Sequence, residues 1–81
     1  MGKLNIRVIT LTNEKGQITP LYMKPGQYAE WQKITKVIGN PVRRASLKAG
    51  GVGMRYNCVI NNIDTYLYDE EDKGWFIERD N

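Results

Sequence analysis

The residues with the clearest capacity for recognition chemistry lie in the C-terminal half of the 81-residue chain. Successive side chains of a β-strand point to opposite faces of the sheet, so alternating residues share one face. Aromatic rings and arginine on an open sheet face are typical of protein interfaces. We interpret five such residues as a protein-binding surface: Arg55, Asn57, Tyr66, Tyr68 and Phe76. The alternative is that the rings only shelter one another, with Arg55 over Tyr68 as a cation–π pair.

The distribution of charge supports a second hypothesis. Residues 31–63 contain no Asp or Glu and carry +6, whereas residues 64–81 carry −5, within a net charge of +3. A positive surface can hold phosphates or an acidic protein patch. A nucleic-acid-binding protein would use these cations, with aromatic rings stacking on bases: Lys33, Lys36, Arg43, Arg44, Lys48 and Arg55. The other interpretation is that the charged side chains are merely solvated and that the two poles partly cancel in space.

Catalytic and metal chemistry finds little support in the composition. The chain contains no histidine, which is the commonest general base and a frequent metal ligand. Its single cysteine, Cys58, alternates with apolar residues and is expected to be a buried, inert thiol. One cysteine cannot form an internal disulfide, and no apolar run approaches the roughly 20 residues that span a bilayer. We therefore expect a cytoplasmic, non-enzymatic protein with no cofactor, no metal, no small-molecule substrate and no membrane contact.

Three short segments have weaker functional signals. Gly50–Gly53 could cradle an anion with its backbone N–H groups, but it precedes a strand and has no P-loop spacing, so a flexible connector is favoured. The acidic residues 69–72 lack the spacing of a calcium loop and are expected to form a solvated turn. Ser46 follows Arg43-Arg44-Ala45 in a pattern that resembles a kinase substrate site, which we treat as a chance match.

The element that must position the aromatic residues is a hairpin over residues 54–67. Asn61-Asn62 is suited to a two-residue type I′ turn, because Asn tolerates positive φ better than most residues. With this turn, Ile60 faces Ile63, Cys58 faces Thr65 and Tyr56 faces Leu67. One apolar face then continues across both strands, and a register slip of one residue would break it.

Other strands are predicted from alternation and turn residues. Residues 3–12 and 17–23 form an N-terminal hairpin, and residues 75–78 return beside the central hairpin after the acidic turn. Pro20 cannot donate a ladder hydrogen bond, so its strand should lie at a sheet edge. A further short strand is expected over residues 42–47.

A helix of roughly three turns is predicted between Gly26 and Gly39. Its apolar residues recur at helical spacing: Tyr28, Trp31, Ile34 and Ile38, with Val37 beside them. Gly39 is suited to the position after the helix, and Pro41 cannot continue it.

Together these elements predict a single α+β domain over residues 1–81. The sheet is largely antiparallel, formed by the N-terminal hairpin and a C-terminal three-stranded meander, with one helix packed on one face. Such a helix cannot cover both faces, which leaves the aromatic face for a partner. The expected function is a small regulator, inhibitor or adaptor that binds another protein. Its exposed strand edges also make it a candidate homodimer.

Overall fold

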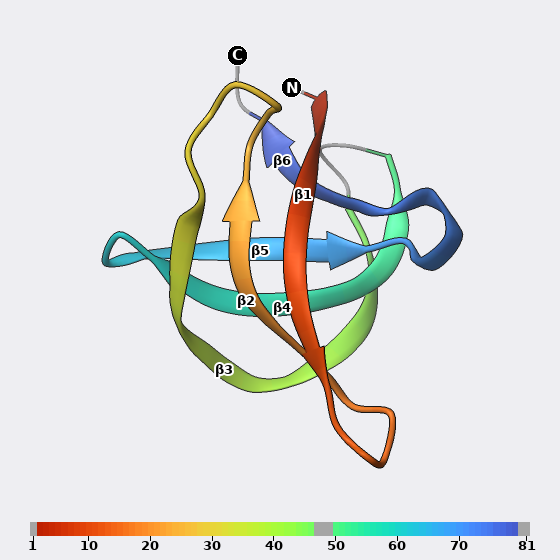
Figure 1. Cartoon of the computed structure of the whole chain (residues 1–81). Helices are drawn as coiled ribbons and strands as arrows, with labels where there is room; N and C mark the ends of the chain where they lie inside the picture. The colour runs from red at the N-terminus through yellow and green to blue at the C-terminus, as the bar shows by residue number, and fades with distance from the viewer. Residues whose placement is uncertain (1, 47–49, 80–81) are drawn as a thin grey trace.

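The computed structural model describes residues 2–46 and 50–79, and these form a closed antiparallel β-barrel. The elements are β1 (Gly2–Thr12), β2 (Ile18–Lys24), β3 (Gln32–Ala45), β4 (Val52–Ile60), β5 (Ile63–Asp69), the short 3₁₀ turn η1 (Glu71–Lys73) and β6 (Trp75–Arg79). Each strand pairs with the next, and β6 pairs with β1 to close the barrel. In Figure 1, β1 and β2 run across the direction of β4 and β5, and β3 curves from one pair to the other.

The predicted α+β fold is wrong, because the described residues contain no α-helix. The segment expected to be helical forms a bend at Gly26–Ala29, where the Ala29 N–H donates to the Gly26 carbonyl, followed by the long strand β3. The helical spacing has a specific origin in β3. The register shifts between Ile34 and Lys36, so the inward-facing Ile34 and Val37 are three residues apart instead of two. A bulged strand of β-branched residues therefore imitates the apolar period of a helix.

A second irregularity bends β3 further. Ile38 lies opposite Asn57 and Val42 lies opposite Arg55, so β3 has extra residues between these pairs. Gly39 lies in this segment with φ of 67°, a conformation that side-chain-bearing residues rarely adopt. The short strand predicted over 42–47 is the last part of β3 up to Ala45, and residues 47–49 lie outside the described part of the chain.

The central hairpin is confirmed in both register and turn type. β4 and β5 pair Ile60 with Ile63, Cys58 with Thr65 and Tyr56 with Leu67. Asn61 and Asn62 both have positive φ, 53° and 63°, as a type I′ turn requires. The turn residues and the alternation of the two strands agree, so this part of the sequence determines its own pairing.

The sheet curls into a barrel and so covers its own apolar face. In the predicted fold, a helix covers this face. The barrel interior is filled by inward-facing residues from all six strands, among them Ile6, Met23, Ile34, Tyr56, Cys58, Ile60 and Leu67, flanked by Leu4, Val8, Val37, Met54, Trp75 and Ile77. The rings of Tyr56 and Trp75 lie 5.2 Å apart at an angle of 41°, a favourable tilted arrangement. Closure leaves the outer surface of the barrel as the face open to other molecules.

The barrel is closed weakly at one seam. Among the described residues, β2 and β3 pair only at Tyr22 with Lys33 and at Met23 with Gln32. Pro20 lies in the part of β2 that has no described pairing partner on β3. At this residue β2 is therefore an edge strand on that side, as predicted. The β1–β2 hairpin continues past this point and projects from the barrel in Figure 1. Across the described ranges, no helix has the length and apolar character needed to span a bilayer.

Candidate functional site

The outer face of β3, β4 and β5 carries a set of exposed apolar and aromatic side chains around one arginine. Residues directly opposite one another on antiparallel strands share a face. One row across the three strands is Ile38, Asn57 and Tyr66, and the next begins with Val42 and Arg55. Ile38, Val42 and Tyr66 are 39%, 43% and 42% exposed. We name these five residues the β3–β5 outer patch: Ile38, Val42, Arg55, Asn57 and Tyr66.

Arg55 is held within this patch by its neighbours. Its guanidinium carbon lies 4.3 Å from the centroid of the Tyr66 ring, within the range of a cation–π contact. The sequence-based alternative placed Arg55 over the Tyr68 ring, whereas the ring it covers is that of Tyr66. Stacking on the Tyr66 ring reduces the freedom of this long side chain and holds Arg55 on the outer face of the barrel.

Asn57 has an unsatisfied polar atom beneath the exposed residues of the patch. Its side-chain oxygen Oδ1 is buried and accepts no hydrogen bond from any described residue. A buried acceptor without a donor costs about 1–3 kcal/mol, and such groups in native proteins are uncommon. This unpaired acceptor lies between Ile38 and Tyr66, below the surface of the patch, where it lowers the stability of the free protein.

Tyr68 and Phe76 are not open to a partner, which corrects the expectation that they form part of an exposed face. They project outward from the barrel, opposite one another on β5 and β6, yet they are only 2% and 0% exposed. Their rings stack with centroids 4.7 Å apart and planes 8° from parallel. Together they form a small apolar cluster outside the main core.

The cover over this cluster comes from residues distant in sequence. Lys3 places its ammonium nitrogen 4.7 Å from the centroid of the Phe76 ring and forms an ion pair with Glu70. Gly51 lies so close that an added Cβ would be 2.9 Å from the Phe76 ring. Ion pair and glycine backbone thus exclude solvent from the outer side of Phe76.

Gly50–Gly53, favoured above as a flexible connector, belongs to this tight packing. An added Cβ on Gly53 would lie 2.5 Å from the backbone oxygen of Asp69. The Ser46 N–H donates to the Gly51 carbonyl at 2.7 Å, and the Gly50 N–H donates to the Ser46 carbonyl at 2.8 Å. The glycines let the start of β4 approach β5 closely.

Ser46 and Tyr68 belong to a buried polar group beside the cluster. The Ser46 hydroxyl donates to Oε2 of Glu78 at 2.8 Å, and Ser46 is almost fully buried. Burial raises the pKa of the Tyr68 hydroxyl, as does the charge of Glu78, while its side-chain hydrogen bonds with Arg55 and Ser46 lower it in part. The kinase-like segment therefore presents its serine to the protein interior.

The cations proposed for nucleic-acid binding are distributed along the length of β3 and onto β4. Lys33 lies opposite Tyr22, Lys36 opposite Val59, and Arg44 opposite Gly53 near the far end of β3. Arg43 forms an ion pair with Glu71 at 3.0 Å, and Arg55 belongs to the β3–β5 outer patch. Lys48 lies outside the described residues.

Sequence reasoning missed a second group of exposed aromatic residues next to cations. Tyr22 is 38% exposed and lies directly opposite Lys33. The Lys24 ammonium lies 5.5 Å from the centroid of the Trp31 ring, which is 43% exposed. We name Tyr22, Lys24, Trp31 and Lys33 the β2–β3 strip. The sequence pattern predicts Trp31 on the apolar face of a helix. Because that helix is absent from the described residues, the exposure of Trp31 beside Lys24 could not be predicted.

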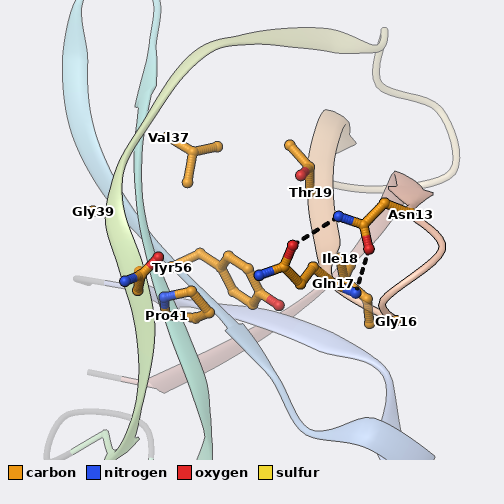
Figure 2. A pocket seen from close by; sticks show the side chains of 10 residues that line it. Asn13, Gly16, Gln17, Ile18, Thr19, Val37, Gly39, Pro41 and Tyr56 are labelled. Atoms are coloured by element: carbon orange, nitrogen blue, oxygen red, sulfur yellow. Dashed lines mark hydrogen bonds between the residues drawn. The ribbon is translucent and has the colours of Figure 1, made fainter.

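A cleft of about 640 Å³ opens where β2 and β3 separate. It is lined by Asn13, Gly16, Gln17, Ile18, Thr19, Val37, Gly39, Asn40, Pro41 and Tyr56, none of which is charged. Figure 2 shows the Tyr56 ring extending from β4 toward Gln17. In the hairpin, the Asn13 side-chain amide donates to Oε1 of Gln17 at 2.7 Å, and Asn13 Oδ1 accepts from the Gln17 N–H at 3.0 Å (Figure 2).

Cys58 confirms its predicted place in the core. It is fully buried, and burial raises the pKa of its thiol from 9.0 to about 11, so it is a poor nucleophile at neutral pH. Within residues 2–46 and 50–79, no three Cys, Asp or Glu side chains gather closely enough to hold a metal ion.

Comparison with known proteins adds no assignment: no protein-family model, no curated protein and no solved structure matches this chain.

Proposed function

We propose that this protein is a small non-enzymatic binding module that recognises another protein through the β3–β5 outer patch. The observation that carries the proposal is the combination of Ile38, Val42 and Tyr66, each about two-fifths exposed, with Arg55 stacked on Tyr66. Central aromatic and arginine residues surrounded by aliphatic side chains are the usual composition of energetic centres in protein interfaces. Three residues of the patch, Arg55, Asn57 and Tyr66, belong to the binding surface predicted from the sequence. The other two, Ile38 and Val42, do not.

The charge around the patch favours a partner with an acidic surface. Lys36 and Arg44 lie on the same outer face of β3, on either side of Ile38 and Val42. Asp64, which lies opposite Val59 on β5, is an acidic residue on the same outer face. A carboxylate of the partner could pair with Arg55, whose planar guanidinium is suited to two parallel hydrogen bonds.

The exposed aliphatic residues Ile38 and Val42 enlarge the apolar part of the same surface. A regulator, inhibitor or adaptor in the cytoplasm would fit this chemistry, and a second copy of the chain is the alternative partner. The lone buried cysteine is compatible with a reducing compartment.

Site-specific cross-linking in the native host tests the proposal. A photo-reactive phenylalanine analogue at Val42 should capture a discrete protein, because Val42 lies in the patch and its exposed side chain can be replaced without disturbing the core. The same analogue at Thr12, exposed in the projecting hairpin, is the control and should not capture that protein. Equal capture from both positions, or capture from neither, would contradict the proposal, whereas a cross-linked dimer of this chain would identify the partner as a second copy.

Single-stranded nucleic acid is a second candidate ligand, favoured by the β2–β3 strip. Tyr22 and Trp31 offer exposed rings on which bases could stack, and Lys24 and Lys33 lie beside them. Binding should weaken steeply with salt, in proportion to the phosphates contacted. Tyr22→Ala with Trp31→Ala should abolish the binding of an oligonucleotide of mixed sequence, and the absence of a gel shift at low salt would exclude this candidate.

A further inference from the structure

The cleft between β2 and β3 exists because two neighbouring strands separate while each continues to pair on its other side. β2 still pairs with β1 as far as Ile18 opposite Thr12, and β3 still pairs with β4 along its length. Within the described residues, however, the pairs between β2 and β3 end after Tyr22 with Lys33. The stretches 18–21 and 34–41 therefore have no ladder partner on the sides that face each other, although Pro20 and Ile34 within them are buried.

Sequence features keep this seam from closing. Pro20 has no N–H group to donate to a ladder, and β2 has an extra residue where Ile9 and Thr10 pair with Tyr22 and Pro20. On the other side, Gly39 has positive φ and marks the segment where β3 bends. Unpaired strand edges are templates for another strand, and proteins normally cover them.

Tyr56 supplies the second, independent observation. It is 5% exposed, and its ring is fixed against Trp75 inside the barrel, with centroids 5.2 Å apart. Its hydroxyl nevertheless reaches the cleft (Figure 2) and forms no hydrogen bond with any described residue. Burial raises its pKa, so the hydroxyl is protonated at neutral pH and can donate to an acceptor in the cleft.

The lining identifies the chemistry of the occupant. None of the residues that line the cleft carries a charge, and the lining combines Asn13, Gln17 and Asn40 with apolar groups. A phosphate or carboxylate would find no counter-charge there. An extended main chain needs donors and acceptors at strand spacing, which the Tyr56 hydroxyl and the unpaired stretch of β3 can supply.

We propose that the cleft binds an extended, uncharged peptide segment, which enters between β2 and β3 and accepts a hydrogen bond from the Tyr56 hydroxyl. At about 3.3 Å per residue, the unpaired stretch 18–21 has the length of a segment of about four residues, although the buried Pro20 offers that segment no N–H. This site is separate from the β3–β5 outer patch. Its lining residues Val37 and Tyr56 face the barrel interior, whereas the patch lies on the outer face of the same strands.

Selection from a library of displayed random seven-residue peptides tests the proposal. The enriched peptides should lack charged residues over at least four positions, and each should then be made with alternate backbone nitrogens methylated. Methylation removes backbone donors while the side chains stay the same, so it should weaken binding at least tenfold. In two-dimensional NMR spectra, the amide signals of residues 18–19 and 34–40 should shift on addition of the unmethylated peptide.

Variants of the protein distinguish this site from others. Tyr56→Phe removes one hydrogen bond and should weaken peptide binding about three- to tenfold. Thr19→Trp places a large ring in the cleft from an exposed position and should abolish binding without disturbing the core, whereas Thr12→Trp, outside the cleft, should have no effect. Tyr66→Ala should also have no effect, since that residue belongs to the β3–β5 outer patch. The proposal is overturned if no peptide is enriched, if methylated peptides bind as well, or if Thr19→Trp binds normally.

Discussion

The guanidinium of Arg55 covers the ring of Tyr66 on the outside of the barrel, with 4.3 Å between its central carbon and the ring centroid. Both residues lie on neighbouring strands of the β4–β5 hairpin, whose register is set by the Asn61-Asn62 turn. A local turn therefore fixes the relative position of the two residues that define the candidate interface.

Tyr66 and Phe76 should respond differently to truncation, although both are aromatic residues on outward-facing positions. Phe76→Ala empties a fully buried site and should lower the free energy of unfolding by about 3–5 kcal/mol. Tyr66→Ala loses an exposed ring and one cation–π contact, which should cost about 1 kcal/mol or less. Urea denaturation of both variants measures the difference. Similar losses for the two would contradict the burial of Phe76 beneath Gly51 and Lys3.

Gly53→Ala should destabilise the protein by at least about 1–3 kcal/mol, the range typical of overpacking. Its new Cβ would lie 2.5 Å from the Asp69 backbone oxygen, which cannot rotate away as a flexible side chain could. Gly26→Ala is the matched control, because no atom lies within 4 Å of the added Cβ and no positive φ is required there. Thermal melts of the two variants check this prediction, and it fails if Gly53→Ala melts with the wild type.

The sequence predicted what short-range rules determine and failed where distant segments decide. The β4–β5 hairpin follows from Asn61-Asn62 and from alternation, both of which are local. The bulge after Ile34 places the inward-facing residues Ile34 and Val37 three positions apart, which is a helical spacing. No residue near the bulge indicates its presence in the sequence.

The candidate site was predicted in part for the same reason. Arg55, Asn57 and Tyr66 were placed on one face because hairpin register determines it. The burial of Tyr68 and Phe76 depends on Lys3, Gly51 and Glu70, which approach only after the barrel closes. The β2–β3 cleft results from strands that fail to pair, and single-sequence patterns carry little information about pairing between distant strands.

Alkaline pH should destabilise the protein through groups that are buried in the neutral form. Burial raises the pKa of Cys58 from 9.0 to about 11, so between these values the unfolded chain ionises while the folded chain does not. Stability should be fully retained below pH 9 and fall as pH rises toward 11, by at most roughly 2–3 kcal/mol for this thiol. The raised pKa values of Tyr56 and Tyr68 act in the same direction. Urea midpoints from pH 7 to 11 provide the measurement.

Cys58→Ala is the control for this pH dependence. It should reduce the alkaline loss of stability and leave only the part due to the tyrosines. An unchanged profile in this variant would show that the thiol is not the group responsible. In the wild-type protein, a thiol-specific reagent at neutral pH should modify Cys58 only as fast as the protein unfolds.

Asn57→Leu should raise the stability of the free protein by about 1 kcal/mol, because it replaces an unsatisfied buried oxygen with apolar atoms of similar size. Urea denaturation of this variant and of the wild-type protein measures the difference. A variant that is less stable than the wild type would contradict the assignment of Asn57 Oδ1 as a buried acceptor without a donor.

The most direct test of the protein-binding account is the affinity of the partner captured at Val42 for two purified variants, Tyr66→Ala and Tyr28→Ala. Both remove an exposed tyrosine ring, but Tyr28 is 94% exposed and lies outside the patch. Tyr66→Ala is expected to weaken binding at least about tenfold, as for a residue at the energetic centre of an interface, while Tyr28→Ala should leave the dissociation constant unchanged. Equal dissociation constants for Tyr66→Ala and the wild type would show that the β3–β5 outer patch is not the binding surface.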